Sequence, residues 1–170
     1  SRSLNALRPI ALVCSLLGFI VLGAIVAVFI LLHRSLPHLD GEMRMAGIKD
    51  PVEIHRDDQG IPSIHARSSH DAVAAQGFVH AQDRFHQMDM YRRISSGRLA
   101  EVVGEVALDT DIEMRRHRLK QVSEGVLERM SADRRSLLEV YAVGVNEGLN
   151  SLQAPPLEYL IMGLKPEPWT

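Results

Sequence analysis

The feature of this chain that most constrains its fold is an apolar run from Pro9 to Leu32 that contains no charged residue. At about 1.5 Å per residue, a helix of this length can cross a hydrocarbon core of ~30 Å. The run therefore predicts a transmembrane helix. It also contains Cys14, the only cysteine of the chain, so no internal disulfide can form and the fold must depend on packing.

A cleaved signal peptide is the alternative interpretation of this run. The apolar part of a signal peptide is about 7–15 residues long and is followed by a small-x-small cleavage site. The present run is longer, and residues His33 to Pro37 offer no such site. Both points favour an uncleaved anchor.

The charges around the run bear on its orientation. Arg2 and Arg8 precede it and His33 and Arg34 follow it, so the positive-inside bias is nearly balanced. A short N-terminal end stays more naturally in the cytoplasm. Residues 1–34 are therefore predicted to form a cytoplasmic tip and a transmembrane signal anchor, with the rest of the chain on the periplasmic or extracellular side.

Composition and residue spacing argue against a nucleic-acid-binding protein and against a metal site in this chain. The formal net charge is −2, and the chain has neither a basic domain nor the Cys/His spacing of a zinc finger, so no nucleic-acid partner is expected. The eight histidines are scattered singly and form no HExxH motif or helical pair. No metal ligand is therefore assigned in this chain.

The first segments after the anchor are predicted to be a tether and a β-hairpin. Residues 35–50 are polar and are expected to form a juxtamembrane tether. Beyond them, a turn-rich stretch at 56–60 is flanked by apolar residues of strand type, namely Val52, Ile54, Ile61 and Ile64. Asp57 can hydrogen-bond the backbone of this turn. Pro62 lacks an N–H group, so the second strand should lie at an edge or begin just after Pro62.

Three helices are expected after the hairpin, because apolar residues recur at helical spacing. The first should run from Ser68 or Ser69 to about Ile94, the second from Thr110 to Met130, and the third from Ala132 to Leu152. Their lengths would allow antiparallel packing. The proline-rich phrase from Lys165 to Thr170 cannot form a regular helix. The chain is thus predicted to be α+β.

The segment from Gly77 to Glu101 combines an apolar stripe with many polar residues. The stripe consists of Ala74, Phe78, Ala81, Phe85 and Met88, and Gln-Asp-Arg at 82–84 lies directly beside it. Polar groups in such a position usually need fixed partners. The segment is therefore interpreted as a scaffold for a specific contact.

No self-contained active site emerges from the motifs. No serine stands in GxSxG or SxxK, and no cysteine lies outside the apolar run. Two acid–base combinations are conceivable: Asp57 with His55 or His65, and Asp83 with His80 or His86. Structural roles explain both carboxylates more simply, because Asp57 enters a turn and Asp83 can form an ion pair with Arg84.

Several motifs together resemble the penicillin acylase family of N-terminal nucleophile hydrolases. They occur in the family's order between Leu36 and Thr170. The motifs are VEIHRD at 52–57, GIPSIHA at 60–66, GFV at 77–79, AQDR at 81–84, GRLAE at 97–101 and PEPW at 166–169. Residues 51–170 are accordingly predicted to be an incomplete α-chain region of such a precursor.

This resemblance implies a precursor that cleaves itself into an α chain and a larger β chain, and that hydrolyses a linear amide to an acid and an amine. The nucleophile would be the first residue of the β chain, whose free α-amine, with a pKa of about 8, acts as the base. Ser1 of this chain is rejected as that nucleophile because the apolar run follows it at once. The complete fold would be a four-layer αββα structure.

The resemblance also implies calcium in the complete enzyme, but no ligand, substrate contact or catalytic residue can be assigned here. The chain starts without methionine and stops within a motif, so a fragment of a longer reading frame is expected. The substrate remains open among β-lactam side-chain amides, acylated homoserine lactones and lipopeptide acyl groups.

The resemblance implies that this chain has a structural role and supports the β chain. A polar network of Asp57, Gln82, Asp83, Arg84, Arg93 and Glu101 is expected to pack the α chain against the β chain, and apolar faces of the three helices should be left exposed where the β chain would lie. The alternative for the charges is a solvated helix flank. The alternative function is a non-catalytic, membrane-anchored helical module that binds a partner through residues 82–101.

Overall fold

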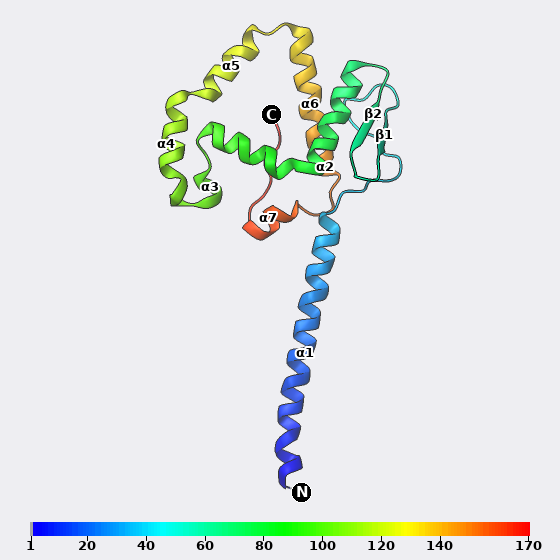
Figure 1. The fold of residues 1–170 in the computed structure, drawn as a ribbon, viewed down its shortest axis with the longest axis vertical. Coiled ribbons are helices and arrows are strands. Elements are labelled where there is room, and N and C mark those ends of the chain that lie inside the picture. Colours follow the sequence, from blue (N-terminus) through cyan, green and yellow to red (C-terminus); the bar gives the residue numbers. More distant parts are fainter. Residues whose placement is uncertain (1) are drawn as a thin grey trace.

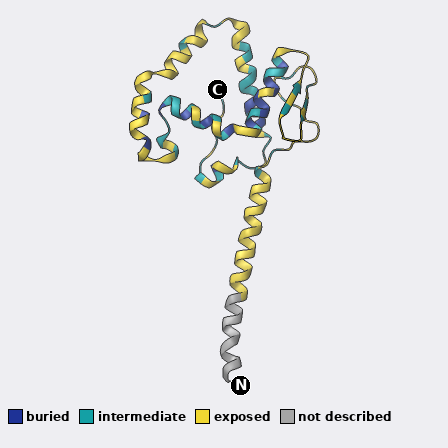
Figure 2. Ribbon diagram, in the orientation of Figure 1, coloured by how far each residue is buried: buried dark blue, intermediate teal, exposed yellow. Residues whose placement is uncertain are grey.

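A computed structural model describes residues 2–170, with side chains from Ser15 onward. The first element, α1 (Arg2–Ser35), is one continuous helix that projects from the rest of the chain (Figure 1). Its part from Ser15 to Ser35 is long and apolar enough to cross a membrane and is not buried by the protein (Figure 2). A signal sequence would have the same properties. Ser1 and the side chain of Cys14 lie outside the described residues.

The segment between α1 and the hairpin forms no helix or strand and lies against the domain. The Lys49 backbone N–H donates to Oδ1 of Asp71 at 2.8 Å, and Nε2 of Gln82 donates to the His38 carbonyl at 3.2 Å. Residues 35–50, expected as a tether, thus make specific contacts with the first residues and the middle of the next helix.

The predicted hairpin is present. Strands β1 (Glu53–Arg56) and β2 (Pro62–His65) are antiparallel, with Glu53 opposite His65 and Arg56 opposite Pro62. Pro62 begins its strand, where a missing N–H group costs little. The turn depends on Asp57, whose Oδ1 accepts from the backbone N–H groups of Gln59 at 2.9 Å and Ile61 at 2.8 Å.

Helix α2 (Ser69–Ser96) begins where the sequence predicts. The Ser68 hydroxyl oxygen accepts from the Asp71 backbone N–H at 3.1 Å and so caps the helix. The helix ends at Gly97, whose φ of 64° suits glycine. It is kinked in the middle, because Arg84 has non-helical torsion angles, with φ −152° and ψ 26°.

The centre of the domain is the crossing of α2 with α6 (Ala132–Asn150). Glycines allow the two backbones to approach: a Cβ atom at Gly144 would collide with the Ala74 carbonyl, and one at Gly148 with the Phe78 carbonyl. These contacts occur in the same order along both helices, so α2 and α6 run parallel (Figure 1). The expectation of antiparallel packing was wrong for this pair, because a long arc of chain separates them.

That arc contains α3 (Ala100–Val103), the 3-10 turn η1 (Glu105–Ala107), α4 (Leu108–His117) and α5 (Leu119–Arg129). The prediction of one helix from Thr110 to Met130 was wrong. Arg118 lies between α4 and α5 with a left-handed φ of 51°, which breaks the helix. The earlier of these two helices, α4, begins at Leu108 and not at Thr110, because η1 leads directly into it.

The chain then continues through α7 (Leu157–Met162) to a C-terminal segment, residues 164–170, without regular structure. The absence of a helix at Lys165 to Thr170 agrees with the sequence prediction, whereas α7 was not predicted. A small core joins these parts; it contains the buried Ala81, Phe85, Val145 and Tyr159, with Trp169 packed against it.

Candidate functional site

The most buried polar cluster of the domain is centred on Asp89, in the second half of α2. Its carboxylate is fully buried. Arg93 Nε donates to it at 2.9 Å, Arg92 Nη2 at 2.6 Å and the Tyr159 hydroxyl at 2.6 Å. A buried carboxylate is tolerated when it is paired and hydrogen-bonded in this way. Asp89 therefore joins two turns of α2 to α7.

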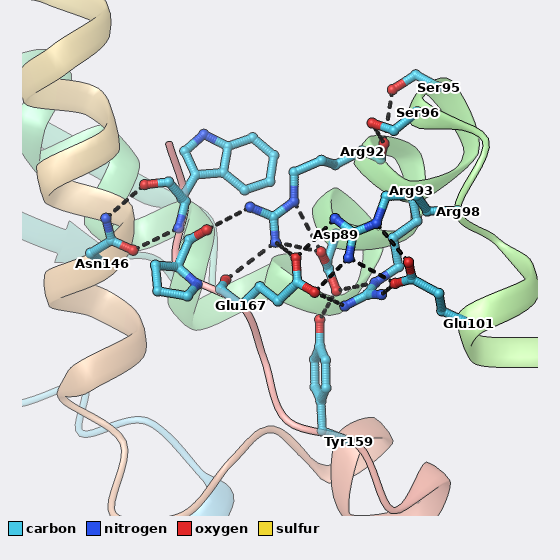
Figure 3. Close-up of polar contacts among 12 residues, drawn as sticks. Asp89, Arg92, Arg93, Ser95, Ser96, Arg98, Glu101, Asn146, Tyr159 and Glu167 are labelled. Atoms are coloured by element: carbon cyan, nitrogen blue, oxygen red, sulfur yellow. Dashed lines mark hydrogen bonds and ion pairs between the residues drawn. The ribbon is translucent and has the colours of Figure 1, made fainter. Parts of the chain in front are cut away.

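The cluster extends outward through carboxylates on two other segments (Figure 3). Arg93 Nη1 donates to Glu101 Oε2 at 2.6 Å. Arg98 Nη2 donates to Glu101 Oε2 at 2.7 Å and to Glu167 Oε1 at 2.6 Å. Arg98 thereby connects the start of the arc with the C-terminal segment. We call Asp89, Arg92, Arg93, Arg98, Glu101, Tyr159 and Glu167 the Asp89 network.

Hydrogen bonds, charges and burial within the Asp89 network shift the pKa values of its acidic groups and of Tyr159. Burial alone would raise the pKa of Asp89, but the hydrogen bonds from Tyr159, Arg93 and Arg92 outweigh it and hold that pKa below its usual range. The hydrogen bond from Arg98 likewise lowers the pKa of Glu101 and that of Glu167. Burial and the adjacent Asp89 carboxylate raise the pKa of Tyr159. The three carboxylates are therefore ionised at neutral pH.

The C-terminal segment is held from a second direction by α6. The Asn146 side chain donates to the Trp169 carbonyl at 2.8 Å and accepts from the Trp169 backbone N–H at 2.8 Å. Arg92 lies over the indole ring, 4.9 Å from its centroid, and donates to the Pro168 carbonyl. The Pro-Glu-Pro-Trp motif is thus fixed between α2 and α6 (Figure 3).

A separate polar cluster joins the hairpin to the kink of α2. Arg56 donates to both carboxylate oxygens of Asp83, at 2.8 and 3.1 Å, and its Nη2 lies 3.5 Å from Gln82 Oε1. This two-pronged geometry orients the hairpin on the helix. The expected ion pair between Asp83 and Arg84 was wrong, because the kink at Arg84 leaves the carboxylate facing β1 instead.

The residues expected to form a single support network therefore lie in different places. Gln82 and Asp83 belong to the hairpin cluster, whereas Arg93 and Glu101 belong to the Asp89 network. Asp57 stabilises its own turn. Arg84 is exposed and forms no hydrogen bond or ion pair within residues 15–170.

The histidines considered as acid–base partners have other contacts. His80 Nδ1 lies 2.9 Å from the Tyr141 hydroxyl, and His55 Nε2 lies 3.3 Å from an exposed Glu53 carboxylate. Burial lowers the pKa of His80, so that residue is neutral. The ring of His65 lies edge-on to His55, and that of His86 lies edge-on to Tyr159. Within residues 15–170 none of the four candidate histidines forms a hydrogen bond or ion pair with Asp57 or Asp83.

Within the described residues no group of three or more His, Cys, Asp or Glu side chains could hold a metal ion. The calcium expected for the complete enzyme stays a prediction. The polar clusters have structural roles, because they neutralise buried charge and hold together segments that are distant in sequence. In the described residues these clusters connect the hairpin, the arc and the C-terminal segment to α2.

Sequence reasoning missed the centre of this scaffold. Asp89 lies on the predicted helix, but its distance from Tyr159 in the chain hid the contact. Asp111 was missed as a cap: its two carboxylate oxygens accept from the backbone N–H groups of Leu99 and Ala100, each at 2.8 Å, and thereby begin α3. The phrase PEPW was the available signal that the C-terminal segment has fixed contacts.

These features define a helical scaffold region with a two-stranded hairpin and a clamped C-terminal segment. A family model described as penicillin amidase matches residues 51–170. The chain belongs to the penicillin amidase family.

Individual relatives agree with this assignment. The chain is 42% identical over 138 residues to the penicillin acylase 2 proenzyme of Pseudomonas sp. (strain SE83). The aligned region covers 81% of this chain and 18% of that relative. It is 39% identical over 136 residues to the acyl-homoserine lactone acylase QuiP of Pseudomonas aeruginosa, covering 79% of this chain and 16% of that protein. The chain thus spans less than a fifth of the length of these relatives.

The fold is also similar to a solved structure, the thermostable penicillin G acylase from Alcaligenes faecalis. The TM-score is 0.64 at 31% sequence identity, and the match covers 71% of this chain and 66% of that one. The resemblance of the sequence to the penicillin acylase family is confirmed, and so is the combination of a hairpin with helices.

Proposed function

We propose that this chain is the N-terminal α-chain region of a membrane-anchored amidohydrolase that hydrolyses the linear amide of an acylated substrate to an acid and an amine. Family membership favours such an enzyme over a non-catalytic helical module. The named relatives are a penicillin acylase and an acyl-homoserine lactone acylase. Acylated amines with a linear amide are therefore the proposed substrate class.

In this proposal the described residues hold and orient the catalytic part but do not react themselves. The nucleophile and its base would come from the β chain of the same precursor, and the isolated α region would be inactive. Calcium would bind to residues outside the clusters described above. No described residue of this chain is given a role in bond breaking.

The observation that carries the proposal is the exposed apolar face of α5. Its sequence is amphipathic, yet none of its residues is buried (Figure 2). Val122 is 56% exposed and Val126 45%, while Val106 and Ile112, which precede them on the arc, are 84% and 52% exposed. Apolar residues left exposed along one face of a helix are typical of an interaction surface. We assign it to the β chain.

A double variant of α5 tests this assignment. Val122→Asp/Val126→Asp in the full-length precursor should block maturation, because charges on the apolar face would remain buried and unpaired beneath the β chain. The measurement is the ratio of uncleaved precursor to mature chains on a denaturing gel. The matched control is Lys120→Asp/Glu124→Lys, which alters two exposed charges of the same helix.

Normal processing of the control with accumulation of uncleaved Val122→Asp/Val126→Asp would support the proposal. Equal processing of both variants, with full amide hydrolysis, would show that the β chain does not use this face.

A further inference from the structure

A cavity of about 580 Å³ lies where α1 meets the rest of the chain. It is bounded by the last turns of α1, the kink of α2 and the residues that lead into α7. Its apolar lining includes Phe29, Leu32 and Leu157, and its polar lining includes Arg84 and His86. This volume falls within the range of ~300–1,000 Å³ that is usual for small-ligand sites.

The apolar side of the cavity is continuous with the surface of the candidate membrane span. Phe29 and Leu32 belong to that span and are 67% and 38% exposed. The end of α1 is fixed to the domain, because the Ser35 hydroxyl donates to the Pro155 carbonyl at 2.8 Å and the Ala154 N–H donates to the Arg34 carbonyl at 3.1 Å. The cavity is therefore held at the end of the span.

The polar side of the cavity offers unpaired groups. Arg84 is exposed and makes no ion pair within residues 15–170; of the two carboxylates that also line the cavity, Asp83 is paired with Arg56 and Glu158 is exposed. His86 Nδ1 is buried without a hydrogen-bond partner in the same part of the chain. A guanidinium beside an apolar surface at the end of a span matches an anionic headgroup with an attached acyl chain.

We propose that this cavity binds a membrane phospholipid, with an acyl chain along Phe29, Leu32 and Leu157 and the headgroup phosphate on Arg84. This inference rests on the membrane anchorage in the proposed function. Continuity of the apolar lining with the span distinguishes this occupant from a soluble ligand, and Arg84, which has no carboxylate partner among the described residues, supplies a donor for its phosphate. The phospholipid would fix the height of the domain above the bilayer.

The test uses the native full-length polypeptide in nanodiscs that contain phosphatidylglycerol with a photoreactive diazirine in one acyl chain. After irradiation, labelled peptides are identified by mass spectrometry. Wild-type protein should carry label on residues 81–87 or 152–158 as well as on α1. Leu157→Trp should reduce the label on the cavity peptides at least fivefold by filling the cavity, and Arg84→Gln should reduce it about threefold by removing the phosphate partner.

The matched control is Leu138→Trp, which adds the same ring at a half-exposed position of α6 outside the cavity lining and should leave the labelling unchanged. Label on α1 alone would overturn the cavity site while preserving the anchor. Label on neither would overturn both. Cavity labelling that is unaffected by both Leu157→Trp and Arg84→Gln would show general surface contact and also overturn the proposal. Amide hydrolysis by the same samples reports on the proposed enzyme separately.

Discussion

The Tyr159 hydroxyl donates a 2.6 Å hydrogen bond to Oδ2 of Asp89, and both side chains are fully buried although they are 70 residues apart in the chain. This contact connects α7 to the second half of α2. Arg92 and Arg93 both pair with this carboxylate, and Glu101 and Glu167 supply the further negative charge that the two arginines need.

Replacing Asp89 should therefore be strongly destabilising. Asp89→Ala leaves two arginines without their buried partner and should lower the free energy of unfolding by roughly 3–5 kcal/mol. Tyr159→Phe removes one hydrogen bond to a charged acceptor and should cost about 1.5–3 kcal/mol. Urea unfolding followed by circular dichroism measures both. A loss for Asp89→Ala no larger than that for the exposed Lys120→Ala would contradict a central role for the carboxylate.

Stability should fall in acid because of the same network. Asp89, Glu101 and Glu167 have lowered pKa values in the folded chain. Protons therefore bind more readily to the unfolded chain, so the stabilisation is present above the ordinary values of 3.8 for Asp and 4.5 for Glu and is lost as the pH falls through the lower folded values. Melting temperatures measured from pH 7 to pH 2 should drop below about pH 4.5. A wild-type melting temperature that does not change with pH would contradict this explanation. So would a fall in the melting temperature of Glu101→Gln/Glu167→Gln that equals the fall in wild type.

The crossing of α2 and α6 should not tolerate a side chain at Gly144. An added Cβ would collide with the Ala74 carbonyl, which belongs to rigid backbone, so Gly144→Ala should cost at least ~1–3 kcal/mol through overpacking. Gly125→Ala on α5 is the control. Its Cβ would meet only the flexible Arg129 side chain, and the gain in helix propensity should stabilise the protein by up to about 1 kcal/mol. Thermal unfolding of the two variants would refute the close crossing if both changes had the same sign.

The pair between Arg56 and Asp83 should matter for maturation. Asp83→Ala in the full-length precursor is expected to leave uncleaved protein on a gel, because the hairpin loses its two-pronged attachment to α2. Glu53→Ala, which breaks an exposed pair with His55 on the same hairpin, should be processed normally. Normal processing and amidase activity of Asp83→Ala would identify Asp83 as an ordinary surface residue.

Local signals in the sequence were sufficient for the elements that local contacts form. Asp57 indicated the hairpin turn, and Ser68 marked the start of α2, whose end at Ser96 lies two residues beyond the expected Ile94. These residues form hydrogen bonds with residues close to them in the chain. Both partners therefore lie within a short stretch of sequence, and the interaction can be predicted from it.

Contacts that depend on tertiary structure could not be predicted in the same way. Arg118 adopts a left-handed conformation that its residue type does not favour, so no helix break was expected there. Asp83 had an arginine beside it in sequence but pairs with Arg56, 27 residues away, because the kink at Arg84 turns the carboxylate towards β1. The buried partner of Asp89 required knowledge of α7, a helix too short to give a periodic signal.

The membrane anchor has its own test. Deletion of Pro9 to Leu32 should move the protein from the membrane fraction to the soluble fraction, because these residues supply the only candidate span among the described helices. Cell fractionation followed by immunoblotting measures the distribution. The full-length protein must remain in the membrane after a high-salt wash, and its release by salt alone would argue against an integral anchor.

The most direct test of the central claim is hydrolysis of a panel of linear amides by the complete native protein, with acid and amine products measured by mass spectrometry. The panel contains a β-lactam side-chain amide, an acylated homoserine lactone and a lipopeptide. We expect release of acid and amine in equal amounts from at least one of them, only after the precursor has been cleaved into two chains. An uncleaved protein that hydrolyses none of the amides would contradict the assignment.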